Sequence, residues 1–129
     1  MPLYSRFLRH EPNEFTASTQ RVKHPAFMPN KEIDKDTKKT YLSKSIFNID
    51  DLPQPDIWQL AELNVIGVKA RGDILDAVII TTGLEIDFNN DPPRHANIIG
   101  WDNSENDMAR EKNKTYVMKL AGSSRLVIR

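Results

Sequence analysis

One stretch in the second half of the chain places an arginine and a histidine where functional groups are often found. Asp91-Pro92-Pro93 is followed directly by Arg94 and His95, and then by the apolar run 96–99 and Gly100-Trp101. The two prolines restrict the backbone that leads into the polar pair. Binding and catalytic residues commonly lie on loops that a rigid scaffold positions. The order of residues predicts that Arg94 and His95 stand at the mouth of a buried strand.

Two carboxylates precede this stretch. Glu85 and Asp87 alternate with apolar residues across 84–88, a pattern typical of a half-buried strand, so both carboxylates are expected on one face. A histidine beside a carboxylate can act as a general base near neutral pH, and an arginine can stabilise a phosphoryl anion. One hypothesis is therefore a small, nuclease-like phosphodiester hydrolase. In it His95 is the base, Arg94 stabilises the anion, and either carboxylate orients the histidine. The alternative is structural: an arginine–carboxylate pair, and a histidine bonded to the backbone.

Few other residue patterns offer chemistry. The chain has no cysteine, which excludes disulfides, thiolate metal sites and a cysteine nucleophile. No recognised metal-ligand pattern is present, so we expect neither a metal nor a cofactor. A phosphate-cradling glycine loop and a nucleophile elbow are also missing from the sequence. These sequence absences weaken the case for a familiar enzyme and leave open whether the protein is an enzyme at all.

Charge is distributed unevenly along a chain whose net charge is zero. Residues 1–45 carry nine basic and five acidic side chains, residues 46–107 carry three and twelve, and residues 108–129 carry six and one. If the two basic ends meet in the fold, they form a face that attracts phosphate groups or an acidic partner. The alternative is ordinary pairing of surface charges. Candidate binding residues, with basic groups for phosphates and aromatic rings for bases, are Tyr4, Arg6, Arg9, Arg21, Lys23 and Phe27.

The elements that must position these groups follow from hydrophobic periodicity and breakers. Strands are expected at 3–8, 41–49, 84–88, 96–99 and 125–129, and helices at about 55–64 and 105–121. Residues 74–80 fit either a strand or a short helix, with a slight preference for the helix. Arg71-Gly72-Asp73 is predicted to be a polar turn. Residues 11–40 contain three prolines and little periodicity, which indicates a long arm that ends in a charged connector.

These elements predict an α+β fold with a small mixed, mainly antiparallel sheet, two or three helices on one of its faces, and a long N-terminal arm. Residues 1–40 form the N-terminal strand and extended arm, and residues 41–129 form the α+β body, as one domain overall. No apolar run approaches the roughly 20 residues of a membrane helix, and the first residues lack the apolar core of a signal peptide. We therefore expect a cytoplasmic protein with no membrane partner.

The motifs around these elements resemble a known group of sequences. The stretch Asp91 to Trp101 occurs together with 25–29 (Pro-Ala-Phe-Met-Pro) and with Ile57-Trp58 on a helix after 47–49 (Phe-Asn-Ile). This combination, which spans most of the chain, resembles a family of small uncharacterised bacterial proteins. The resemblance implies a bacterial, cytosolic, single-domain protein and adds no activity. The functional hypotheses are thus a soluble binding or accessory module for a protein or nucleic-acid partner and, as the alternative, the phosphodiester hydrolase.

Overall fold

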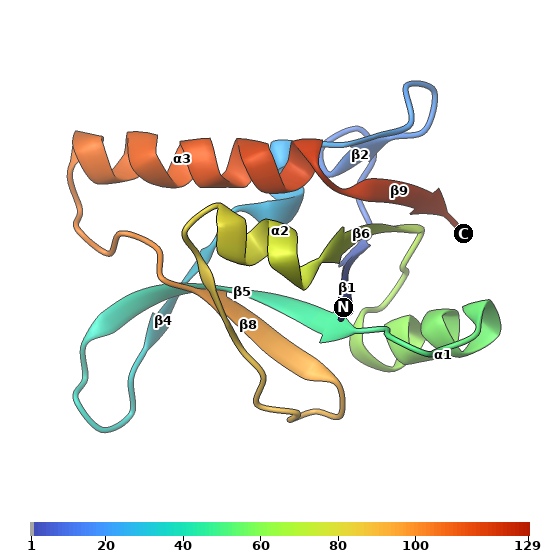
Figure 1. Cartoon of the computed structure of the whole chain (residues 1–129), viewed down its shortest axis with the longest axis horizontal. Helices are drawn as coiled ribbons and strands as arrows, with labels where there is room; N and C mark the ends of the chain where they lie inside the picture. Colours follow the sequence, from blue (N-terminus) through green and yellow to red (C-terminus); the bar gives the residue numbers. More distant parts are fainter. Residues whose placement is uncertain (1) are drawn as a thin grey trace.

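The central strands carry apolar residues on both faces, which form two hydrophobic clusters. Figure 1 shows the sheet and the helices that surround it. The computed structural model describes residues 2–129. Its seven-stranded sheet has the order β7-β8-β5-β1-β6-β9, with β4 paired to β5, and every pairing among the described strands is antiparallel. The strands are β1 (Leu3–Leu8), β4 (Asn30–Ile33), β5 (Thr40–Asn48), β6 (Ala70–Leu75), β7 (Glu85–Asp87), β8 (His95–Ile99) and β9 (Arg125–Ile128). The predicted α+β class is confirmed.

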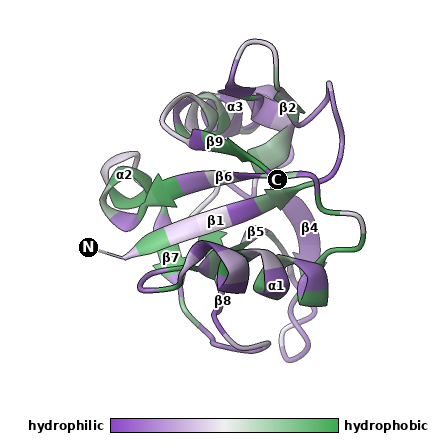
Figure 2. Cartoon of the chain, turned by 90° about the vertical axis from the view of Figure 1, so that its right-hand side faces the viewer, coloured by the Kyte–Doolittle hydropathy of each residue, from purple (hydrophilic) through white to green (hydrophobic). Residues whose placement is uncertain are grey.

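Helices cover both faces of the sheet. Phe7 and Phe47 stack at 5.2 Å on one face under α1 (Gln54–Asn64), whereas Leu8 and Ile46 face the opposite core under α3 (Asp107–Gly122). Figure 2 shows α1 on one side of β1 and β6 and α3 on the other. The expectation that all helices lie on one face is wrong, because the alternating residues of β1 and β5 are apolar on both sides and each side must be buried. None of the helices in residues 2–129 is long and apolar enough to cross a membrane.

The Arg71-Gly72-Asp73 segment is a buried part of β6 and not a turn. Hydrogen bonds join β6 to β1 on one side and to β9 on the other. Arg71 is only 2% exposed: its Nε donates to Asp73 at 3.0 Å, and its guanidinium lies 4.8 Å from the centre of the Trp58 ring. Local composition predicts a turn here, but the ion pair and the aromatic contact compensate the two charges within the core. Residues 74–80, for which the sequence fits either a strand or a short helix, form the end of β6 and most of α2 (Asp76–Thr81).

The N-terminal arm is ordered against the body. It contains the hairpin β2 (Phe15–Thr16) and β3 (Arg21–Val22), the short 3-10 helix η1 (His24–Phe27), and β4. Because β4 pairs with β5, the expected charged connector begins as a strand. Arg6 fastens the arm: its guanidinium donates to the carbonyl oxygens of Ala26 and Ser45, both at 3.2 Å. This side chain bridges the gap where β1 separates from β5 beyond Ser5.

Candidate functional site

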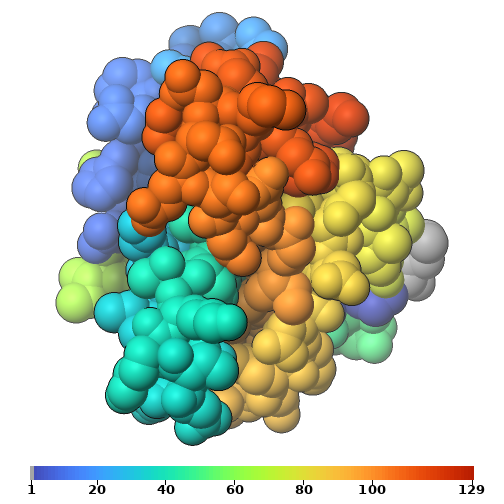
Figure 3. All heavy atoms as spheres, turned by 90° about the vertical axis from the view of Figure 1, so that its left-hand side faces the viewer, coloured from blue at the N-terminus to red at the C-terminus, as the bar shows by residue number. Residues whose placement is uncertain are grey.

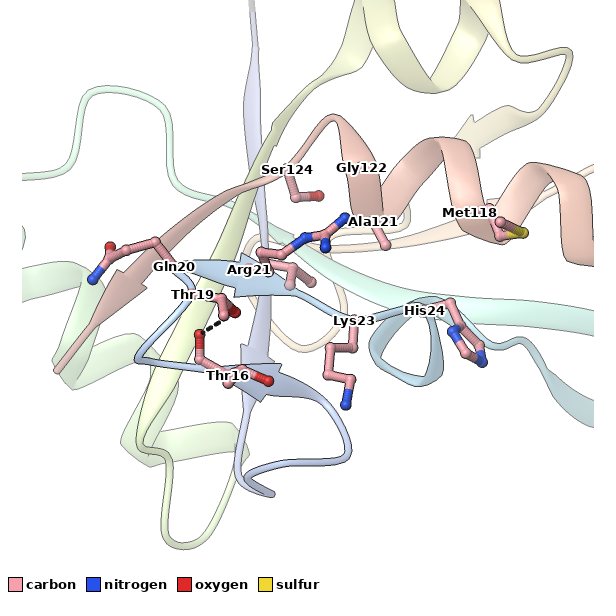
Figure 4. Close-up of a pocket in the computed structure, with 11 residues that line it drawn as sticks. Thr16, Thr19, Gln20, Arg21, Lys23, His24, Met118, Ala121, Gly122 and Ser124 are labelled. Atoms are coloured by element: carbon pink, nitrogen blue, oxygen red, sulfur yellow. Dashed lines mark hydrogen bonds between the residues drawn. The ribbon is translucent and has the colours of Figure 1, made fainter.

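The two basic ends of the chain meet in the structure. η1 and β3 pack against α3, and β3 also packs against β9. The space-filling view shows the blue N-terminal arm directly beside the orange helix α3 (Figure 3). Between the β2–β3 hairpin and the end of α3 lies an open groove of about 530 Å³ (Figure 4). We call it the basic groove; its lining residues are Thr16, Thr19, Gln20, Arg21, Val22, Lys23, His24, Met118, Ala121, Gly122 and Ser124.

Alternation along β3 points the basic side chains outward. Val22 is buried and pairs with buried Phe15, so its neighbours Arg21 and Lys23 emerge towards solvent. Gly72 leaves room for the buried Val22 side chain, because a Cβ at position 72 would lie 3.1 Å from a methyl group of Val22. Figure 4 shows the Arg21 side chain directed towards the end of α3. The hairpin therefore holds its cations on a fixed backbone.

The basic groove has no acidic lining residue. The two carboxylates that precede the β2–β3 hairpin accept hydrogen bonds from nearby backbone: Glu14 accepts from the N–H groups of Arg9 and His10 at 2.9 and 3.0 Å, and Glu11 accepts from that of Ala17 at 2.7 Å. Neither Arg21 nor Lys23, the cationic residues that line the groove, takes part in any of the ion pairs found among residues 2–129. The groove therefore presents uncompensated positive charge to a ligand.

The end of α3 contributes hydroxyl and backbone groups to the same groove. Ser124 Oγ donates to the carbonyl of Leu120 at 2.7 Å, and the Ser123 N–H donates to that of Lys119 at 3.0 Å. These bonds satisfy two of the free carbonyl groups at the C-terminal end of α3, where the helix dipole is negative. Arg21 and Lys23, across the groove, thus remain available to an external anion.

His95 lies at a second location, on the opposite face of the sheet from α3. It is 9% exposed and its ring meets Phe47 edge-on at 5.4 Å. Its Nε2 is 2.7 Å from Ser45 Oγ, and its Nδ1 is 2.8 Å from Asn89 Oδ1. Burial lowers the pKa of His95, although the nearby Asp91 and Asp87 oppose this effect. The ring is therefore neutral at neutral pH.

The predicted partners of His95 have other roles. Arg94 Nη1 donates to the carbonyl oxygens of Asn48 and Asp50, both at 3.1 Å, and so joins the start of β8 to the end of β5. Glu85 and Asp87 are exposed on β7, and neither forms a hydrogen bond with the imidazole. The prediction of an orienting carboxylate is wrong, because an amide oxygen of the β7–β8 loop occupies that position.

The candidate binding residues divide into four groups. Arg21 and Lys23 line the basic groove, whereas Arg9 is exposed outside it. The aromatic rings of Tyr4 and Phe27 are 5% and 0% exposed, so neither can stack on a base. Arg6, described above, fastens the arm. The groove also contains hydroxyl groups and His24, which the sequence pattern did not mark as binding residues although His24 directly follows Lys23.

Ser45 and Asn89 were also missed. Ser45 lies 50 positions from His95, and only the strand register brings them together, so no local pattern could have found this contact. No family model, no curated protein and no solved structure matches this chain. The resemblance to a bacterial family therefore stays a prediction, and the function is inferred from the geometry of the two sites.

Proposed function

We propose that the protein is a small nucleic-acid-binding module that engages a phosphodiester backbone through the basic groove. The observation that supports this most directly is the meeting of the two basic chain ends at a groove with no acidic lining residue. The guanidinium of Arg21 matches the paired oxygens of a phosphate, and Lys23 adds a flexible point charge. The hydroxyl of Thr16, which also lines the groove, supplies a further donor for a phosphate oxygen.

The proposed binding is independent of base sequence. The rings of Tyr4 and Phe27 are buried in the core, and no Phe, Tyr or Trp lines the groove. Contacts to phosphate position a nucleic acid without reading its bases. The module would therefore recognise a backbone and act as an accessory part of a larger assembly. We also propose a bacterial, cytoplasmic setting, which a chain without cysteine favours.

The test is the salt dependence of binding, measured by the fluorescence anisotropy of a short labelled single-stranded oligonucleotide. With the two cationic contacts of Arg21 and Lys23, log K should fall against log salt with a slope of about −1.4. Raising the salt from about 50 to 200 mM should therefore weaken binding roughly sevenfold. The double variant Arg21→Gln/Lys23→Gln should reduce the slope to about zero.

A matched control separates the groove from net charge. Lys38→Gln/Lys39→Gln removes the same charge from the exposed β4–β5 turn and should leave both affinity and slope unchanged. Equal weakening by the two double variants would contradict a groove-specific site. An acidic peptide such as oligoglutamate that displaces the oligonucleotide at equal charge concentration would indicate a protein partner instead.

A further inference from the structure

The side chains of Ser45, His95 and Asn89 form one continuous hydrogen-bonded chain. The two links measure 2.7 Å, from Ser45 Oγ to Nε2, and 2.8 Å, from Nδ1 to Asn89 Oδ1. The residues come from β5, the start of β8 and the β7–β8 loop. A hydroxyl, an imidazole and an orienting oxygen in this order make up the arrangement that activates a serine for nucleophilic attack.

A second hydrogen bond fixes which ring nitrogen carries the proton. The backbone N–H of Asp91 also donates to Asn89 Oδ1, at 3.3 Å. The atom that faces the ring must therefore be an acceptor, so Nδ1 carries the proton and donates it. In the neutral ring Nε2 then holds the free lone pair, and Ser45 donates its hydroxyl proton to it. The tautomer required for a general base is thus the one that the loop imposes.

The surroundings hold this base in position. The His95 N–H donates to the carbonyl of Pro92, and the Asn90 N–H donates to the carbonyl of His95, both at 2.9 Å, so the loop is closed on itself. The edge-on contact with Phe47 limits rotation of the ring. A base that is both neutral and fixed can accept a proton without reorganising the site.

A donor for a developing oxyanion stands beside the serine. Asn97 is paired directly with Ser45 across β5 and β8, which places both side chains on one face with their Cβ atoms about 5 Å apart. Both residues are partly exposed. On the far side of Asn97, its partner Asp87 adds an exposed carboxylate, and Glu85 adds another on the same strand. These carboxylates repel a negatively charged phosphodiester and so favour an uncharged substrate.

We propose that Ser45 is the nucleophile of a hydrolytic site for uncharged carboxylic esters, with His95 as general base and Asn89 as a positioning residue. Ser45 Oγ bonds to the ester carbonyl carbon while its proton passes to His95 Nε2, and the carbonyl π electrons move to oxygen beside the Asn97 amide. Collapse of this intermediate breaks the bond to the alcohol oxygen, which takes the proton from Nε2. Water then attacks the acyl-serine by the same route, releases the carboxylic acid and restores Ser45.

The test combines turnover with identification of the modified residue. We expect the wild-type protein to hydrolyse p-nitrophenyl acetate and to react with a fluorophosphonate probe, with peptide mapping placing the adduct on Ser45. Ser45→Ala should abolish the adduct, and His95→Gln should slow turnover roughly hundredfold or more. Ser43→Ala, two residues away on the same strand, is the matched control and should keep both activities.

Two variants of Asn89 distinguish its proposed positioning role from a purely structural role. Asn89→Asp should keep the adduct and move the acid limb of the pH–rate profile to higher pH, because a carboxylate in place of the amide stabilises the imidazolium. Asn89→Ala should slow labelling while the melting temperature and oligonucleotide binding show that the protein stays folded. An adduct on another residue, such as Lys44, would overturn the proposal. So would wild-type turnover no faster than that of a folded Ser45→Ala protein. Neither result would affect the basic groove, which shares no residue with this site.

Discussion

Replacing the buried lysine of β5 should stabilise the protein at neutral pH. Lys44 is 6% exposed and takes part in none of the ion pairs found among residues 2–129. Burial, reinforced by the nearby Arg6 and opposed by Glu14, lowers the pKa of Lys44 from 10.5 to about 8. That difference corresponds to about 3 kcal/mol of folding free energy. Lys44→Met keeps an unbranched side chain, shorter by one heavy atom, and removes the charge.

The sign and the pH window follow from linkage. Because the folded pKa lies below the unfolded one, the unfolded state binds more protons between about pH 8 and 10.5. Stability of the wild-type protein therefore rises with pH through this window, and the penalty is complete at pH 7. The Lys44→Met protein should have a free energy of unfolding up to about 3 kcal/mol higher at pH 7, and this gain should shrink towards zero near pH 10.5.

Urea denaturation at a series of pH values measures this gain. Lys35→Met, at an exposed position of the β4–β5 turn, is the control for an added methionine and should change little at any pH. A stabilisation by Lys44→Met that is the same at pH 7 and near pH 10.5 would refute the electrostatic reasoning, because the gain would then come from packing. A loss of stability at pH 7 would refute it as well.

Three further predictions concern the stability of the fold. Arg94 has a φ of 72° and two guanidinium–carbonyl bonds, so Arg94→Ala should cost about 2 kcal/mol in thermal or urea unfolding. Arg94→Gly should cost about 1 kcal/mol less, and an equal loss would contradict strain at this position. Gly72→Ala should cost about 1–3 kcal/mol through its clash with Val22, and Val22→Ala in the same chain should recover part of that loss. Burial lowers the pKa of His95, so wild-type stability should fall as pH drops below about 6.5; His95→Gln should remove this acid dependence, and an unchanged profile would contradict it.

Local patterns predicted most of the secondary structure correctly. The strand at 3–8 matches β1, and the expected helices at 55–64 and 105–121 differ from α1 and α3 by at most two residues at either end. These elements have a clear apolar period and clear breakers. The buried β6 segment at 71–73 was not predictable in this way, because its two charges are compensated by each other and by Trp58, which lies 13 residues earlier.

The sites were less predictable than the fold. The basic character of Arg21 and Lys23 was evident from composition, but their position opposite α3 depends on the arm folding back over the sheet. Tyr4 and Phe27 were misassigned because aromatic rings in a basic segment fit both base stacking and core packing, and here core packing prevails. The partners of His95 depend on strand register, which the sequence does not specify on its own.

The most direct test of the proposed function is where an oligonucleotide perturbs the protein. Backbone amide chemical shifts, recorded by NMR during titration with a short single-stranded oligonucleotide at low salt, report this residue by residue. We predict that the largest changes fall at 19–24 and 118–124, on the two walls of the basic groove. Changes centred instead on β7 and β8, or no saturable change at any residue, would contradict the proposal that this groove binds nucleic acid.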